Sequence, residues 1–454
     1  MFVLNQLTIM KLKFAVAAIA LMGVIASCAV TPVPVVPSID VTIVPTTCTS
    51  GVPLAVLGGK YISGKENYSA FHTSSVGDGL GNTYSAGMYT GNVDFGGTQL
   101  VGRGAYLSKS DRIGKFIWVV KLPDVTYLDQ RFFDRIFPYD RLHPKVYLSG
   151  GKVVVKGLKS VVGKYPVKIV STYNTDGMAV NSVEIPGNIY VYGEEIRYAM
   201  GDVFFDATGN KYYALHKSTG SYLQKINAAG TVVWTKNMSS VEEYTEAFVV
   251  NLLVSSDGSI YMMTRQYARI ENTTQDNFQK RDANGTIIYD TATPEVYSSN
   301  SQPFYTIDAS GNAYSNAKSY RSLMKFNTNG NIAWEKTYPY EQEVTGLSVD
   351  ISGNIYAIGN LRGNTLTVGS TTLVRNTPIL YYIMKLNSSG DGLWPYFVKL
   401  PTATPANALI VHNNLSEIFV AGDNLYLTGS IDKQAGSNTF KGYDFFSIRY
   451  KICP

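Results

Sequence analysis

The sequence predicts an all-β fold, a single β-propeller built from four-stranded antiparallel blades. A turn of the form Asp-x-x-Gly-Asn, followed by a short apolar run, recurs along the chain, as in "DISGNIYAIG" at 350–359 and "DATGNKYYAL" at 206–215. The chain has 33 tyrosines and 41 glycines but only 16% charged residues, which suits short strands and tight turns better than long surface helices. Sheets repeated every few tens of residues are typical of propellers.

The unit at 346–398 shows how one blade is encoded. Its first two apolar runs are joined by the turn Asp350–Asn354, and its last two by the turn Asn387–Asp391. Glycine supplies the positive φ that such turns need, and the Asp and Asn side chains cap the local backbone. Four short antiparallel strands per unit are therefore expected, at Leu347–Val349, Ile355–Ile358, Tyr381–Leu386 and Leu393–Val398.

Seven such units can be aligned on the central residue of the second run, which we call the blade anchor. The spacing between anchors is 42 to 70 residues, whereas a β-solenoid would need shorter repeats. Five copies match the repeat pattern closely, and the two that start near 146 and 417 are degenerate. We expect seven blades, with "GNIYVYG" at 187–193 leaving eight as the alternative. The anchors are Tyr84, Val154, Tyr212, Tyr261, Tyr314, Tyr356 and Tyr426.

The ends of a closed ring should meet. The segment "VPLAVLGGKYI" at 52–62 is expected to pair beside the last strands, which would bring Cys48 close to Cys453. A disulfide between them would close a loop of about 400 residues and stabilise the fold by about 5 kcal/mol, less any strain. The alternative is two unpaired thiols.

The repeated pattern Asp-x-x-Gly-Asn-x-Tyr-x-x-Gly, then Lys-Leu-Asn-x-x-Gly, then Trp, resembles two bacterial families. They are the seven-bladed-propeller (SBBP-type) repeat proteins and the related quinoprotein-like repeat. The resemblance covers most of residues 75–450 and implies the propeller fold. It also raises a quinone-cofactor site as one role for the tryptophans, the other being packing between blades, which we favour. The tryptophans are Trp118, Trp234, Trp334 and Trp394.

The segment from Met10 to Cys28, "MKLKFAVAAIALMGVIASC", has the layout of a secretory signal peptide. Lys11 and Lys13 precede an apolar run that is shorter than the ~20 residues of a bilayer span. Ile25–Cys28 resembles the bacterial lipobox, which implies cleavage before Cys28 and its lipidation, palmitate included. An ordinary signal peptide that happens to contain a cysteine is the alternative. We assign 1–27 to the signal peptide, with Met10 as an alternative start.

Residues 28–47 follow as a lipidated cysteine and a Pro-rich tether, and 48–454 form the propeller. Pro32, Pro34, Pro37 and Pro45 favour an extended spacer. By resemblance to lipoprotein sorting, Ala29 after the lipidated cysteine implies the outer membrane, on its surface or its periplasmic side.

No catalytic or metal-binding constellation stands out. His72, His143, His216 and His412 lack metal-ligand spacing, and serine-hydrolase, P-loop and dinucleotide motifs are absent. The turn aspartates could ligate calcium, but they are better explained as turn caps; they are Asp206, Asp257, Asp308 and Asp350. We therefore predict no cofactor, no metal and no catalytic residue, although an active site assembled from different blades would leave no spacing pattern.

Two further features leave alternatives open. The carboxylate pairs Glu194–Glu195 and Glu242–Glu243 are adjacent in sequence, so on a strand they would face opposite sides and make poor acid/base partners. The segment 123–145 combines basic residues and aromatics and is either a projecting loop or a degenerate fourth strand.

These observations predict a lipid-anchored envelope propeller that binds a protein or glycan without catalysis, as a monomer held to the membrane through Cys28. The alternative is a periplasmic or surface enzyme, such as a lyase, a lactonase or a quinoprotein-like dehydrogenase, that uses the central channel. A net charge of +5 is too small to indicate nucleic-acid binding.

Overall fold

In the computed structural model the chain divides into two compact units, 1–37 and 38–454, and the described residues all belong to the second. The possible extra strand at 187–193 and Cys28 lie outside them. The described residues are 39–42, 46–49, 52–63, 69–78, 80–125, 144–159, 167–185, 202–217, 220–238, 246–255, 257–268, 273–293, 305–316, 321–339, 341–374, 381–398, 416–432 and 443–453.

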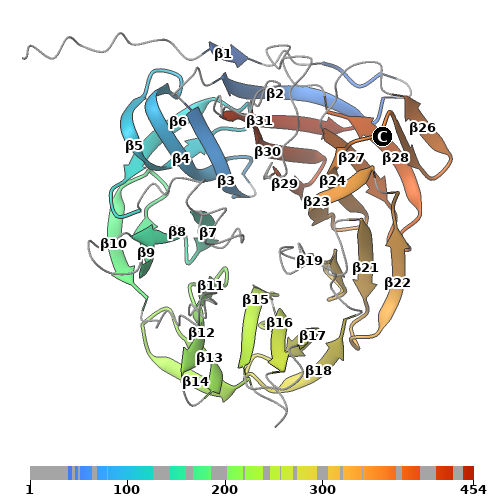
Figure 1. Ribbon diagram of the computed structural model, residues 1–454. Coiled ribbons are helices and arrows are strands. Elements are labelled where there is room, and N and C mark those ends of the chain that lie inside the picture. The colour runs from blue at the N-terminus through green and yellow to red at the C-terminus, as the bar shows by residue number, and fades with distance from the viewer. Residues whose placement is uncertain are drawn as a thin grey trace, which may run out of the picture. The chain divides into compact units, whose positions relative to one another are not determined.

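The second unit is a β-propeller of seven antiparallel blades (Figure 1), which confirms the predicted fold class. No helix occurs among the described residues. In each of the first six blades the chain runs from the innermost to the outermost strand. Blade 1 contains β3 (Ser69–Gly77), β4 (Thr83–Asp94), β5 (Gln99–Ser110) and β6 (Phe116–Leu122); blade 2 contains β7 (Lys145–Ser149), β8 (Lys152–Lys159), β9 (Val167–Tyr173) and β10 (Ala179–Glu184).

The next three blades repeat this order. Blade 3 contains β11 (Asp202–Phe205), β12 (Lys211–Lys217), β13 (Gly220–Ile226) and β14 (Val232–Asn237). Blade 4 contains β15 (Glu246–Val254), β16 (Ile260–Ala268), β17 (Thr273–Arg281) and β18 (Ile287–Ala292). Blade 5 contains β19 (Tyr305–Ile307), β20 (Ala313–Ser315), β21 (Ser322–Phe326) and β22 (Ile332–Thr337).

Blade 6 matches the four predicted runs and carries an insertion. Its strands are β23 (Gln342–Val349), β24 (Ile355–Leu361), β27 (Tyr381–Leu386) and β28 (Gly392–Phe397). Between the second and third strands lies a separate hairpin, β25 (Thr365–Val368) and β26 (Thr371–Val374). Leu366 and Val368 of this hairpin are buried in the core of the blade, so the insertion adds to the packing.

Blade 7 closes the ring with strands from both ends of the chain. Its inner strands are β29 (Ser416–Ala421), β30 (Asn424–Asp432) and β31 (Tyr443–Ile452), and β2 (Leu54–Ser63) pairs with β31 as predicted. A fifth strand, β1 (Ile39–Thr42), covers the outer edge of β2. The structure contains the disulfide Cys48–Cys453, with the two Cα atoms 5.7 Å apart.

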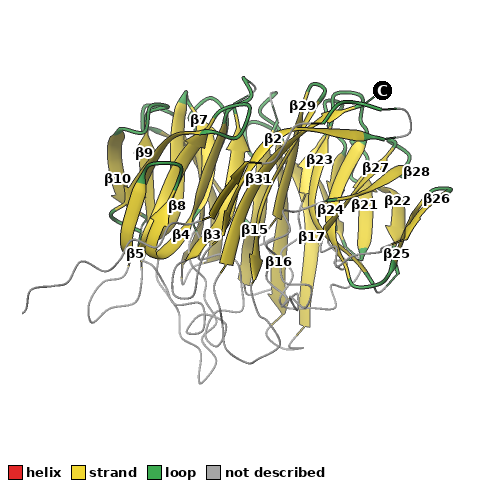
Figure 2. Cartoon of the chain, turned by 90° about the horizontal axis from the view of Figure 1, so that it is seen from above, coloured by secondary structure: helices red, strands yellow, loops and turns green. Residues whose placement is uncertain are grey.

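The alternating strand directions give the ring two different edges. The turns between first and second strands and between third and fourth strands are short and lie on one side, the upper edge in Figure 2; we call this the turn edge. The connections between second and third strands and between successive blades belong to the opposite side, the connection edge. The disulfide lies at the turn edge, because Cys453 directly follows the end of β31.

Side chains of the repeat motif build the turns themselves. Asp350 Oδ1 accepts hydrogen bonds of 2.9 Å from the backbone N–H groups of Ser352 and Asn354, and Oδ2 accepts from the Asn354 amide and the Tyr356 hydroxyl. The same set recurs around Asp206 and Asp308. Gly353 has a φ of 78°, which only glycine adopts readily. These aspartates are turn caps that also position the anchor tyrosine.

We expect Asp308→Ala to lower the free energy of unfolding by about 2 kcal/mol, because it leaves two backbone N–H groups, Asn312 and the Tyr314 hydroxyl without their acceptor. Asp282→Ala is the matched control, since Asp282 caps only backbone groups in a turn between third and fourth strands. Urea unfolding measures both. Equal losses would show that the Asn312 and Tyr314 contacts contribute nothing.

Candidate functional site

The anchors and tryptophans form a repeated row on the turn-edge half of the blades. All seven anchors lie in the second strand of their blades and are at most 5% exposed. In four blades a lysine of the third strand lies over the anchor ring and opposite a tryptophan of the fourth strand, as with Lys325, Tyr314 and Trp334. Trp118, Trp234, Trp334 and Trp394 all belong to these rows.

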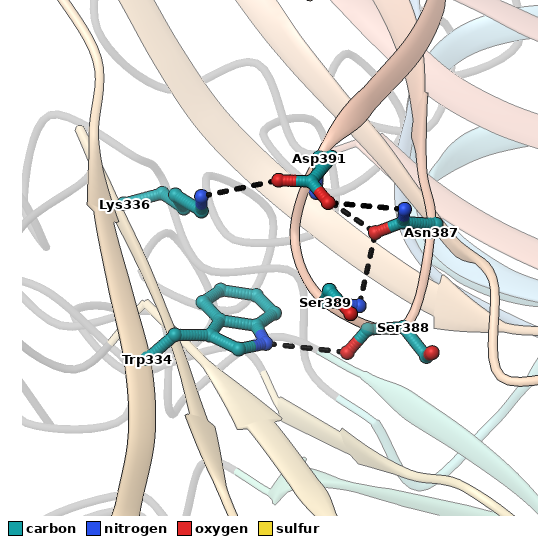
Figure 3. Close-up of polar contacts among 6 residues, drawn as sticks. All are labelled: Trp334, Lys336, Asn387, Ser388, Ser389 and Asp391. Atoms are coloured by element: carbon teal, nitrogen blue, oxygen red, sulfur yellow. Dashed lines mark hydrogen bonds and ion pairs between the residues drawn. The ribbon is translucent and has the colours of Figure 1, made fainter.

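Three of the tryptophans also bind the next blade. The Trp334 indole N–H donates to the backbone carbonyl of Ser388 in blade 6 at 3.2 Å (Figure 3), and the Trp334 ring packs on Gly390. Beside it, Lys336 pairs with Asp391 at 3.5 Å. Trp118 and Trp234 donate to equivalent turns of blades 2 and 4. Because the tryptophans lie in the outermost strands, none of the four lines the axis of the ring.

Titratable and hydroxyl side chains from three blades meet where the innermost strands β29, β3 and β7 lie next to one another, together with Thr428 of β30. We call Ser74, Ser75, Lys145, Glu417 and Thr428 the axial cluster. The backbone N–H and the hydroxyl of Ser75 both donate to Glu417 Oε2, the hydroxyl at 3.1 Å. The hydroxyl of Ser75 also lies 2.6 Å from that of Thr428. The cluster thus joins the last blade to the first.

Burial raises the pKa of Glu417 to about 7, against the opposing effects of the Ser75 hydrogen bonds and the positive charge of Lys145. A carboxyl group with a pKa near neutrality can both donate and accept a proton at physiological pH, as a general acid or base must. On its chemistry alone, the axial cluster is therefore the strongest candidate for reactivity among the described residues.

The geometry also gives the cluster a structural role. Ser74 Oγ accepts a hydrogen bond of 3.2 Å from the backbone N–H of Val146, linking blades 1 and 2. Other innermost strands are linked in the same way: Ser348 Oγ accepts from the N–H of Val420 at 3.0 Å, and the Ser149 hydroxyl donates to the carbonyl of Asp206 at 2.6 Å. Polar side chains near the axis thus bind the backbone of the neighbouring blade.

Three innermost strands carry an irregularity in the same position. Pairing shifts by one residue at Thr73 in β3, Val250 in β15 and Thr345 in β23. Such bulges are common at functional rims, where they redirect side chains. The Thr73 hydroxyl donates to the carbonyls of Ala86 and Pro144, so this bulge also contributes to the link between blades 1 and 2.

The remaining predicted residues are placed as follows. His72 is fully buried in β3, and burial lowers its pKa to about 3; His143 and His412 lie outside the described residues. The described part contains no group of three His, Cys, Asp or Glu side chains arranged to hold a metal. None of its segments is a helix that could cross a bilayer.

The carboxylate pairs and residues 126–143 of the segment 123–145 lie outside the described residues. Blade 1 obtains its fourth strand from β6, which ends at Leu122, so the segment is the connection to β7 and the interpretation as a degenerate fourth strand of this blade is wrong.

No protein-family model and no curated protein sequence matches the chain. Among solved structures, it is similar to a catalytically inactive virginiamycin B lyase from Staphylococcus aureus with quinupristin (9% identity, TM-score 0.44, 90% of this chain and 99% of that one). It is also similar to a protein of unknown function from Dyadobacter fermentans (10% identity, TM-score 0.46, covering 88% of this chain and 100% of that one). A DUF4221 family member from Bacteroides vulgatus is a further similar structure (11% identity, TM-score 0.36, covering 68% of this chain and 92% of that one). Similarities this low carry no argument about activity.

Proposed function

We propose that this chain is a lipid-anchored envelope propeller that binds a protein or glycan and does not catalyse a reaction. The observation that carries the proposal is the use of polar side chains of the innermost strands. Ser74, Ser149, Ser348 and Glu417 each bind the backbone of a neighbouring blade. Groups that could do chemistry are thus engaged in holding the ring together.

The closure of the ring supports a role in presenting a fixed binding surface to a partner. Blade 7 joins both ends of the chain through the pairing of β2 with β31 and through the Cys48–Cys453 disulfide. A ring locked in this way holds the short turns between its strands in fixed places, and binding residues are often found on loops positioned by a rigid scaffold. The signal peptide, the lipobox and the Pro-rich tether support attachment through Cys28 to the outer membrane, on its surface or its periplasmic side.

One observation favours the alternative, an envelope enzyme that uses the axial channel. Glu417 has a pKa of about 7 and faces the charge of Lys145 from another blade. A lyase, a lactonase or a quinoprotein-like dehydrogenase would need such a proton donor or acceptor close to its substrate.

Localisation tests the anchoring. We expect the wild type to incorporate labelled palmitate and to sediment with membranes, and Cys28→Ser to do neither, because no other residue would carry the lipid. Protease treatment of intact and lysed cells then distinguishes the surface from the periplasm. A wild-type protein found unlabelled in the soluble fraction would contradict the proposal.

Binding and catalysis are separated by incubating the purified protein with an envelope extract and comparing the extract by mass spectrometry before and after. A binding protein retains a component of the extract and leaves its composition unchanged. Consumption of a component by the wild type, but not by Glu417→Gln, would overturn the non-catalytic role in favour of the enzyme.

A further inference from the structure

The outermost strand of the closing blade determines where the tether leaves the ring. β2 begins at the turn edge, where Leu54 pairs with Ile452, and ends at the connection edge with Ser63. β1 runs antiparallel to it, with Ile39 opposite Ser63 and Thr42 opposite Lys60. Ile39, the first described residue, therefore lies at the connection edge, on the outermost strand of blade 7 (Figure 1).

The length of the tether limits which edge can approach a membrane. Ten residues lie between Cys28 and Ile39, and the eleven steps from Cys28 to Ile39 can reach about 34 Å in an extended polyproline conformation. The ten residues of β2 span about 33 Å, roughly the height of the blade. To bring the turn edge to the lipid, the tether would have to run back along this whole height and would have no length left. To bring the connection edge to the lipid, the tether needs almost none of its length.

We propose that the connection edge of the propeller faces the lipid surface and that the turn edge points away from it. This inference rests on the proposed lipidation of Cys28, and it adds an orientation to the proposed anchoring. The turn edge, with the disulfide and the tryptophan rows, is then the side presented to a partner that approaches from the aqueous phase.

Two surface positions on opposite edges serve as probes. Val101 is 64% exposed near the start of β5, at the connection edge of blade 1. Ile351 is 92% exposed in the turn that follows β23, at the turn edge of blade 6. Both blades are direct neighbours of blade 7. Because both side chains are exposed and apolar, replacing either with tryptophan should leave the fold intact, and unchanged urea unfolding verifies this for each variant.

The experiment uses the lipidated protein on vesicles of phosphatidylethanolamine and phosphatidylglycerol that contain a dansyl-labelled headgroup lipid. The four native tryptophans lie on the turn-edge half, so energy transfer from them to the dansyl group should be weak. We expect Val101→Trp to raise the transfer severalfold and Ile351→Trp to leave it nearly unchanged. Transfer from Ile351→Trp that equals or exceeds that from Val101→Trp would overturn the orientation.

Co-sedimentation with the vesicles is measured first, with Cys28→Ser as the control. If the wild type fails to co-sediment, the anchoring itself is wrong and the orientation fails with it. If the wild type co-sediments and the two probes give equal transfer, the anchoring stands and only the orientation is wrong. The two failures are therefore distinguishable.

Discussion

Replacing Cys48 and Cys453 together with serine is expected to lower the free energy of unfolding by about 5 to 6 kcal/mol. The disulfide spans 405 residues, so it restricts almost the whole unfolded chain. In the chain-entropy model the stabilisation grows with the logarithm of the loop length, which places this bond at or above the upper end of the usual range of about 0 to 5 kcal/mol. Guanidinium unfolding of the variant and the wild type, under non-reducing conditions, measures the difference.

Reduction of the wild type is the control for this experiment, because it breaks the same bond without changing a side chain. Both forms should lose a similar amount of stability. In both forms the two ends of the chain would still be joined in blade 7 by the backbone pairing of β2 with β31, from Leu54↔Ile452 to Ile62↔Phe445. A loss of less than about 1 kcal/mol would mean that this pairing already keeps the ends together in the unfolded ensemble.

The blades could be predicted because each is encoded locally. The residues from Asp308 to Tyr314 contain a complete capped turn, with its aspartate, glycine, asparagine and anchor tyrosine within seven positions. Repetition of that pattern gave the number of sheets, and the meeting of the ends in a ring predicted the pairing of β2 with β31. The outer strand β1 and the β25–β26 hairpin carry no part of the pattern and were not predicted.

The axial cluster could not be predicted, because its contacts form only after the ring closes. Ser75 and Glu417 are 342 residues apart and belong to strands whose sequences show no complementary feature. The packing role of Trp334 was accessible from its place in the repeat, but its hydrogen bond to the Ser388 carbonyl, 54 residues away, depends on how two blades meet. The bulge at Thr73 likewise follows from pairing, which the residue types alone do not specify.

Replacing Glu417 with glutamine is expected to remove a pH dependence of stability centred between pH 4.5 and 7. The folded pKa of about 7 lies above the ordinary value of 4.5, so the folded state holds its proton more tightly than the unfolded chain does. The resulting stabilisation is fully present below pH 4.5 and is lost as the pH rises through about 7. Ionised Glu417 is then partly buried, which lowers the free energy of unfolding by up to about 3 kcal/mol.

Urea unfolding from pH 4.5 to 9 measures this effect as the difference between the wild type and Glu417→Gln. The variant should be the more stable of the two at pH 8, and the difference should shrink as the pH falls. Glu184→Gln, which removes an exposed carboxylate paired with Lys159, is the control and should follow the wild type. Curves for the wild type and Glu417→Gln that stay parallel over the whole range would show that water reaches Glu417 and that burial does not govern its ionisation.

Lys145→Met gives a second, independent result from the same cluster. The positive charge of Lys145 favours ionised Glu417, so its removal should raise the pKa of Glu417 further and move the pH transition of stability upwards. A transition that does not move would mean that solvent screens the two charges from each other. If Lys145→Met moves the pH transition upwards, and the double variant Lys145→Met/Glu417→Gln shows no such transition, the transition belongs to Glu417 and depends on Lys145. Blades 7 and 2 would then be coupled electrostatically across blade 1, through side chains that become neighbours only when the ring closes.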